Sequence, residues 1–171
     1  KQSVQFAEGV FSGHAVEEEK TKRVRAPKHL SRGDARRFVK GAEIYAREAF
    51  CSTCHQPNGE GLPDAGFPPL AGTKWVLEDS DRLIKLSLKG LMGPIEVKGK
   101  KYPGHVPMTA FGGLLNDDEM ASVLTYIRNS FGNKASAIRP GQVKRIREEL
   151  KDRVDLFQPE ELLKMHPHAT K

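Results

Sequence analysis

The chain has 171 residues, enough for one domain of ordinary size with extensions at its ends. Its formal net charge is +6, and no apolar run approaches the length of a membrane-spanning helix. The positive charges gather in residues 20–40 and 142–153, where solvated helix faces are the favoured interpretation and a docking surface for an acidic protein partner is the alternative. We therefore expect no nucleic-acid partner and no membrane span.

Residues 1–33 are interpreted as a polar extension or linker, because an acidic run is followed by a basic run without apolar periodicity. Ser31 is a suitable helix cap, and Asp34 supports the first turn. Apolar residues then recur at helical spacing: Phe38, Ala42, Tyr45 and Ala49. The pattern predicts an amphipathic helix that leads directly into the cysteine motif.

The two cysteines of the chain lie in the sequence CSTCH, residues 51–55. A Cys-x-x-Cys pair serves a redox dithiol, half of a zinc site or the attachment of a c-type haem. Zinc would need further ligands from isolated or terminal histidines, and a dithiol should follow a strand rather than a helix. Haem attachment explains every residue, because Cys51 and Cys54 can each bond one vinyl group while His55 ligates the iron. We therefore predict one covalently bound haem c.

The stretch after this motif is rich in glycine and proline. Residues 56–75 predict a loop, and residues 80–90 predict a short helix that Gly90 ends. Within the next glycine- and proline-rich stretch, the sequence EVKGKKY, residues 96–102, indicates a small hairpin.

Residues 116–133 carry the clearest helical pattern. Asn116 is a favourable cap followed by an acidic first turn, and Gly132 ends the pattern. The apolar stripe of this helix consists of Met120, Val123, Leu124, Ile127 and Phe131. Residues 140–153 and 159–168 both begin with proline and predict a surface helix and a short helical turn.

Residues 34–133 resemble the class I monohaem cytochromes c, and especially the cytochrome modules of bacterial secreted dehydrogenases and oxidases. GAEIYAREAFCSTCHQPNGEG is similar to the family's first helix and haem motif, FPPLAG to its proline–leucine–glycine loop, PMTAF to its second ligand loop, and LNDDEMASVLTYIRNSFGN to its last helix. The resemblance implies an all-α fold around one haem, with an N-terminal extension, 1–33, and a C-terminal helical extension, 134–171. It also implies that Gly41 faces Tyr126 where the first and last helices cross.

Five residues compete as the second axial ligand of the iron: Met92, His105, Met108, Met120 and Met165. Met108 lies in a proline-rigidified loop, at the distance before the last helix that the resembled family uses. We therefore predict His55 and Met108 as the iron ligands, with His105 as the runner-up. The family often has Met-Pro in this loop, whereas Pro107 precedes Met108 here, which leaves the path of the loop open.

Three further residues are expected to surround the haem. His55 should donate its second ring N–H to a carbonyl group, which fixes its tautomer. Pro68 stands at the family's position for this acceptor, and Pro69 is the alternative. Trp75 and Tyr102 have polar tips that could bind a haem propionate, while plain packing is an equally good interpretation for each.

The expected function is single-electron transfer, as a carrier or as a relay module of an exported redox system. The chain is expected to be no enzyme in its own right, because both axial positions of the iron are filled. The partner is expected to be a redox protein: a dehydrogenase donor, separate or fused upstream, or a terminal oxidase or reductase acceptor.

A periplasmic or otherwise exported location is expected, because c-type haem is attached on the exported side of the bacterial inner membrane. The opening sequence KQSVQFAEGVFSGH has no signal-peptide core, so we expect a mature or excised chain. Two other functions stay open at this point. One is a peroxidase-like haem enzyme with an open or labile sixth site, and the other is a tethering module that the haem only stabilises.

Overall fold

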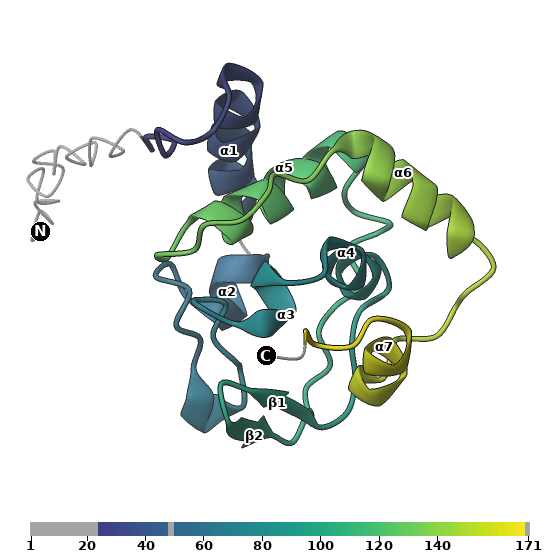
Figure 1. The fold of residues 1–171 in the computed structure, drawn as a ribbon. Coiled ribbons are helices and arrows are strands. Elements are labelled where there is room, and N and C mark those ends of the chain that lie inside the picture. Colours follow the sequence, from purple (N-terminus) through teal and green to yellow (C-terminus); the bar gives the residue numbers. More distant parts are fainter. Residues whose placement is uncertain (1–23, 48–49, 170–171) are drawn as a thin grey trace, which may run out of the picture.

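The structure, a computed structural model, describes residues 24–47 and 50–169 (Figure 1). Within these ranges the fold is mainly helical, as predicted, with one small two-stranded sheet. Most of the predicted N-terminal extension, residues 1–23, lies outside the described residues. The helices are α1 (Arg32–Tyr45), α2 (Cys51–His55), α3 (Lys74–Leu77), α4 (Ser80–Lys89), α5 (Asp117–Asn129), α6 (Pro140–Glu149) and α7 (Pro159–Met165), and the strands are β1 (Ile95–Val97) and β2 (Lys100–Tyr102).

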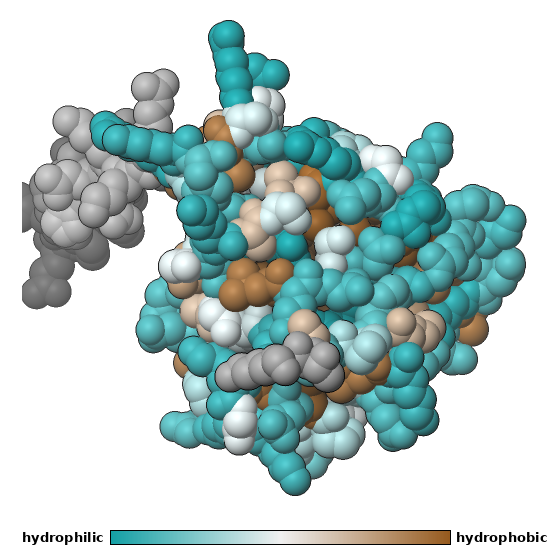
Figure 2. All heavy atoms as spheres, in the orientation of Figure 1, coloured by the Kyte–Doolittle hydropathy of each residue, from teal (hydrophilic) through white to brown (hydrophobic). Residues whose placement is uncertain are grey.

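None of the helices in the described part of the chain is both long and apolar enough to cross a membrane. On the face seen in Figure 2, hydrophilic residues cover most of the surface, and small apolar patches lie between them.

The two long helices begin at the caps that the sequence predicts. The side chain of Ser31 accepts the N–H of Asp34 at the start of α1. Asn116 and Glu119 form a capping box at the start of α5, in which each side chain accepts the other's backbone N–H. Both starts are therefore fixed by local hydrogen bonds, whereas α5 ends at Asn129, three residues before the predicted stop at Gly132.

Helices α1 and α5 cross in close contact, as expected for Gly41 and Tyr126. A Cβ added at Gly41 would overlap the carbonyl oxygen of Ser122 and lie 2.8 Å from the Cβ of Tyr126. The aromatic ring of Tyr126 is surrounded by three others, with centroids 5.0 to 5.7 Å away: Phe38, Tyr45 and Phe131. The missing side chain at position 41 thus permits a crossing that brings an aromatic cluster together, with Phe38 and Tyr45 buried and Tyr126 and Phe131 partly buried.

The predicted hairpin is confirmed as β1 and β2, which pair antiparallel with Val97 opposite Lys100. The two turn residues, Lys98 and Gly99, both have positive φ, 53° and 76°, as a type I′ turn requires. The loop predicted for residues 56–75 contains more structure than expected. It includes a 3₁₀ turn and the start of α3, where the hydroxyl of Thr73 accepts the N–H of Val76 as a cap.

The C-terminal segment packs against the rest of the domain. Helix α6 contacts α4 and α5, and α7 lies beside the loop between α4 and the hairpin (Figure 1). The apolar side chains that this segment contributes to the common core are Ile138, Val143, Ile146, Leu150, Phe157 and Leu162. The boundary predicted at residue 133 stays a prediction, but the described residues beyond it share one core with the preceding helices.

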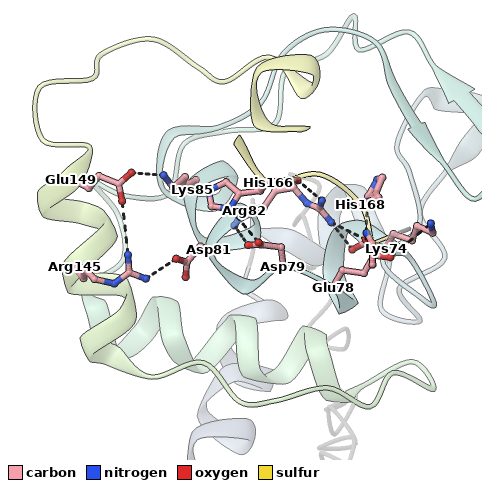
Figure 3. Close-up of polar contacts among 11 residues, drawn as sticks. Lys74, Glu78, Asp79, Asp81, Arg82, Lys85, Arg145, Glu149, His166 and His168 are labelled. Carbon is pink, nitrogen blue, oxygen red and sulfur yellow. Dashed lines mark hydrogen bonds and ion pairs between the residues drawn. The ribbon is translucent and has the colours of Figure 1, made fainter. Parts of the chain in front are cut away.

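Polar contacts also join the C-terminal segment to α3 and α4 (Figure 3). Arg82 of α4 is fully buried and donates to the carbonyl oxygens of His166, at 2.7 Å, and Lys74, at 2.9 Å. Its guanidinium lies 5.0 Å from the centre of the Trp75 ring. The chain after α7 therefore covers a buried cation that would otherwise lack a hydrogen-bond partner on that side.

Candidate haem-binding site

A cavity of about 170 Å³ lies inside the helical shell. Its walls come from α2, the loop after it, α3, α4, the hairpin, the loop that holds Met108, and α5. Most of the lining is apolar and includes Phe50, Leu70, Leu86, Val97, Phe111 and Leu124. Two hydroxyl groups in the wall are bonded to the backbone, since Thr73 caps α3 and Ser87 donates to the carbonyl oxygen of Leu83 at 2.8 Å. The interior is therefore suited to a large apolar group.

The CSTCH sequence forms α2, a short helix whose side chains reach this cavity. Cys51, Cys54 and His55 all line it, because residues three and four positions apart share a helix face. Burial raises the pKa of the Cys51 thiol to about 11. A redox dithiol needs a lowered thiol pKa, so this environment does not favour the dithiol alternative.

The imidazole of His55 is held in one orientation. Its Nδ1 lies 2.8 Å from the carbonyl oxygen of Pro68, so Nδ1–H donates to this acceptor. Burial lowers the pKa of His55 more than the Pro68 carbonyl raises it, which favours the neutral ring. With Nδ1 carrying the proton, Nε2 keeps its lone pair, the form in which histidine ligates a metal.

The chain on either side of His55 is also fixed. The hydroxyl of Tyr45 donates to the carbonyl oxygen of Gln56 at 2.6 Å, and the carbonyl oxygen of His55 accepts the N–H of Gly61 at 3.0 Å. Helix α1 therefore positions the haem motif directly, through a tyrosine whose own side chain is buried.

Met108 lines the same cavity and is half-buried. Of the other ligand candidates, Met120 also lines the cavity but belongs to the buried face of α5. Met92 and Met165 are exposed, 43% and 45%, and His105 is exposed as well; these three do not line the cavity. Met108 is thus the cavity-lining candidate that comes from a loop.

The two aromatic candidates differ in their polar contacts. The indole N–H of Trp75 donates to the carbonyl oxygen of Glu96 at 3.0 Å, so packing and this bond account for it. Tyr102 is buried, and burial raises the pKa of its phenol. No hydrogen bond among the described residues involves the Tyr102 hydroxyl, which makes Tyr102 the better candidate for a polar contact to a bound group.

The structure brings the sequence-predicted residues to one cavity: Cys51, Cys54, His55, Pro68, Trp75, Tyr102 and Met108. Sequence reasoning missed Leu91, whose backbone pairs with that of Met108, because no local pattern indicates a bridge between distant residues. The set fits a covalent haem. It combines two thiols one helical turn apart, a neutral imidazole whose Nδ1–H is bonded to a carbonyl oxygen, a thioether from a loop, and an apolar interior.

Comparisons with known proteins agree with this chemistry. The family model described as Cytochrome c matches residues 38–131, more than half of the chain. Cytochrome c-552 of Thermus thermophilus is 43% identical over 116 residues, which cover 63% of this chain and 83% of that protein.

Two cytochrome subunits of dehydrogenases match over a shorter part of their own length. The cytochrome c subunit of a quinone-type alcohol dehydrogenase from Gluconobacter oxydans is 34% identical over 105 residues, which cover 60% of this chain and 20% of the subunit. The fructose dehydrogenase cytochrome subunit of Gluconobacter japonicus is 32% identical over 115 residues, which cover 63% of this chain and 22% of that subunit. The matched region is therefore about a fifth of each dehydrogenase subunit.

Proposed function

This chain belongs to the cytochrome c family, and on that premise we propose that its haem c is attached through Cys51 and Cys54 and ligated by His55 and Met108. Proteins of this family carry a covalently bound haem c and serve electron transfer rather than catalysis, also as cytochrome subunits of dehydrogenases. One observation supports the proposed ligand set above all others: the CSTCH helix and Met108 line one apolar cavity.

When bound, haem c supplies an iron that exchanges one electron between its ferric and ferrous states. His55 contributes a neutral imidazole whose direction is fixed by the carbonyl oxygen of Pro68. The Met108 thioether is a soft ligand that favours ferrous iron, so it raises the potential relative to a second imidazole. The cavity wall is mostly apolar, and with His55 and Met108 both ligating the iron no position would remain for a substrate.

The ligand set is tested by comparing Met108→Ala with Met92→Ala. A thioether on ferric iron gives a weak absorption band at the red end of the spectrum. This band should be present in the oxidised protein, lost in Met108→Ala, and retained in Met92→Ala, because Met92 is an exposed methionine outside the cavity wall. Met108→His should remain six-coordinate with a lower midpoint potential. If Met108→Ala changed neither spectrum nor potential, the sixth ligand would be another residue.

The open-site alternative makes an opposite prediction for the unaltered protein. If His55 and Met108 both ligate the iron, carbon monoxide should bind the ferrous protein slowly, since Met108 would have to leave first. Rapid binding of carbon monoxide or cyanide without any substitution would instead identify an open site and favour a haem enzyme.

The partner is a redox protein, and we propose a dehydrogenase as donor and a terminal oxidase or reductase as acceptor, in an exported compartment. The similarity to cytochrome subunits named for alcohol and fructose dehydrogenases supports the donor class. Cell fractionation with haem staining tests the location. Recovery of the haem-stained protein only from the cytoplasm would contradict export.

A further inference from the structure

A short backbone ladder joins the Met108 loop to the C-terminal segment. The N–H of Leu91 donates to the carbonyl oxygen of Met108 at 3.1 Å, and the Met108 N–H donates back to Leu91 at 2.8 Å. On the other side of Leu91, the N–H of Phe157 donates to the carbonyl oxygen of Gly90 at 3.1 Å. The carbonyl oxygen of Phe157 accepts the N–H of Met92 at 2.9 Å. Leu91 thus lies between the ligand loop and the C-terminal segment.

These neighbouring chains are in close contact at Gly90. A Cβ added at Gly90 would lie 2.6 Å from the carbonyl oxygen of Met108 and 3.0 Å from Cδ2 of Leu156. The backbone of Gly90 also has φ of +78°, which favours glycine. The Met108 loop and residues 156–157 therefore both contact the same glycine, and a shift of either segment affects the other.

Arg147 of α6 binds the same loop from its other end. The guanidinium donates to the carbonyl oxygens of Gly112 and Leu115, the latter at 2.8 Å. Its Nε–H donates to the carboxylate of Asp117 at 2.7 Å. One cation therefore holds two loop carbonyls and the first turn of α5, with hydrogen bonds of the stronger, charge-assisted kind.

The segment at Phe157 is itself fixed by Arg153. The guanidinium of Arg153 lies 3.7 Å from the centre of the Phe157 ring and donates to the carbonyl oxygen of Leu156 at 3.0 Å. It also forms a two-bond ion pair with Glu161 of α7, at 2.6 and 2.8 Å. Helix α7 thereby anchors the segment, residues 156–157, that supports Leu91.

We propose that the C-terminal clasp, defined as Arg147 and residues 153–158, positions Met108 and limits its departure from the iron. The inference rests on the proposed function, in which Met108 is the sixth ligand. A ligand on a loop leaves only when the loop opens, and the free energy of local opening depends on the contacts that the loop makes. Arg147 and Arg153 supply such contacts from two sides without lining the cavity.

The loop has a second support that remains when the clasp is weakened. The N–H groups of Phe111 and Gly112 donate to the last-turn carbonyl oxygens of α4, Ser87 and Leu88, each at 3.0 Å. Loss of the clasp should therefore raise the frequency of loop opening without unfolding the domain.

The test measures how fast imidazole replaces Met108 in the oxidised full-length holoprotein, followed by loss of the red-end band. Arg147→Gln should accelerate replacement about ten-fold, equivalent to about 1.4 kcal/mol in the opening equilibrium. Arg153→Gln should also accelerate replacement, because Arg153 holds the segment at Phe157 on the other side of Leu91. Arg147→Lys should restore part of the effect, because a lysine keeps the charge but lacks the fork that reaches two carbonyls.

Arg145→Gln is the matched control. Arg145 lies on the same helix, carries the same charge and pairs with the carboxylates of Asp81 and Glu149 rather than with loop carbonyls (Figure 3). Its replacement should leave the imidazole rate unchanged. Urea unfolding of every variant measures its global stability. In the clasp variants, the rate of imidazole binding should rise by more than the loss of global stability explains.

Amide hydrogen exchange over residues 107–115 provides a readout that does not depend on the ligand. Faster exchange there in Arg147→Gln than in Arg145→Gln, together with faster imidazole binding, supports the clasp. Equal rates and equal exchange in the two variants would overturn it. If Met108→Ala leaves the band intact, the ligand proposal fails, and imidazole kinetics no longer report on Met108. Faster amide exchange in Arg147→Gln alone would then show that the clasp holds a loop that carries no iron ligand. That result would overturn the inference as stated.

Discussion

Replacing Gly41 with alanine should destabilise the protein through the crossing of α1 and α5. The new Cβ would lie 2.6 Å from the carbonyl carbon of Ser122 and 2.8 Å from the Cβ of Tyr126. The backbone contact cannot be relieved by a rotamer change, so the two helices must separate. Overpacking of this kind costs roughly 1–3 kcal/mol, and we expect the upper end because backbone is involved.

The intrinsic preference of alanine for helices offsets about 1 kcal/mol of this cost. The net loss for Gly41→Ala should therefore be about 2 kcal/mol, which lowers the Tm of a chain of this size by roughly 4–8 °C. Thermal and urea unfolding of the holoprotein, followed by circular dichroism, measure both quantities.

Gly33→Ala provides the control in the same helix. A Cβ at Gly33 would have Ser31 Oγ as its nearest neighbour, at 3.9 Å, so no clash arises. This variant should be as stable as the unaltered protein or slightly more stable. If Gly41→Ala matched Gly33→Ala, the glycine would not be needed for the crossing, and the packing argument would be refuted.

Two further predictions concern the C-terminal segment. Ile146→Ala should cost about 2–5 kcal/mol in urea unfolding, because its side chain is fully buried in the common core; a change below 1 kcal/mol would mean that α6 is not part of the folded unit. Glu78→Gln should destabilise the protein near neutral pH. Burial by itself raises the pKa of Glu78. The hydrogen bond and the charge of His168 lower this pKa by more, so it lies below its ordinary value of 4.5. A lowered folded-state pKa gives stability that is present above the unfolded value and is lost as pH falls through the folded one. The difference in the free energy of unfolding between Glu78→Gln and the unaltered protein should therefore shrink below about pH 4.5. A difference independent of pH would contradict the role of the ion pair between Glu78 and His168.

Features set by local sequence were predictable. The caps at Ser31 and Asn116 and the hairpin turn at Lys98–Gly99 depend on residues within a few positions of one another. The CSTCH motif likewise carries its chemistry in five adjacent residues, so its side chains reach one cavity once a helix forms. Three long-range inferences came from the family resemblance: the closeness of Gly41 to α5, the acceptor role of Pro68 for His55, and the placement of Met108 at the same cavity as the motif.

The packing of the C-terminal segment could not be predicted in the same way. Charged residues dominate the composition of α6, which favoured a surface helix, but Val143, Ile146 and Leu150 form a narrow apolar stripe on one face. Its contact with α4 and α5, and the bridge from Phe157 to Leu91, depend on residues far apart in the chain. The short helix α3 was missed because its cap, Thr73, follows a glycine-rich loop that dominates the local pattern.

The haem attachment itself is tested most directly by mass spectrometry of the protein matured in a host with c-type assembly machinery. After acid–acetone extraction, the intact mass should still include one haem, and the peptide that contains Cys51 and Cys54 should carry it. An intact mass equal to that of the bare polypeptide, or haem found on any other peptide, would contradict covalent attachment at CSTCH.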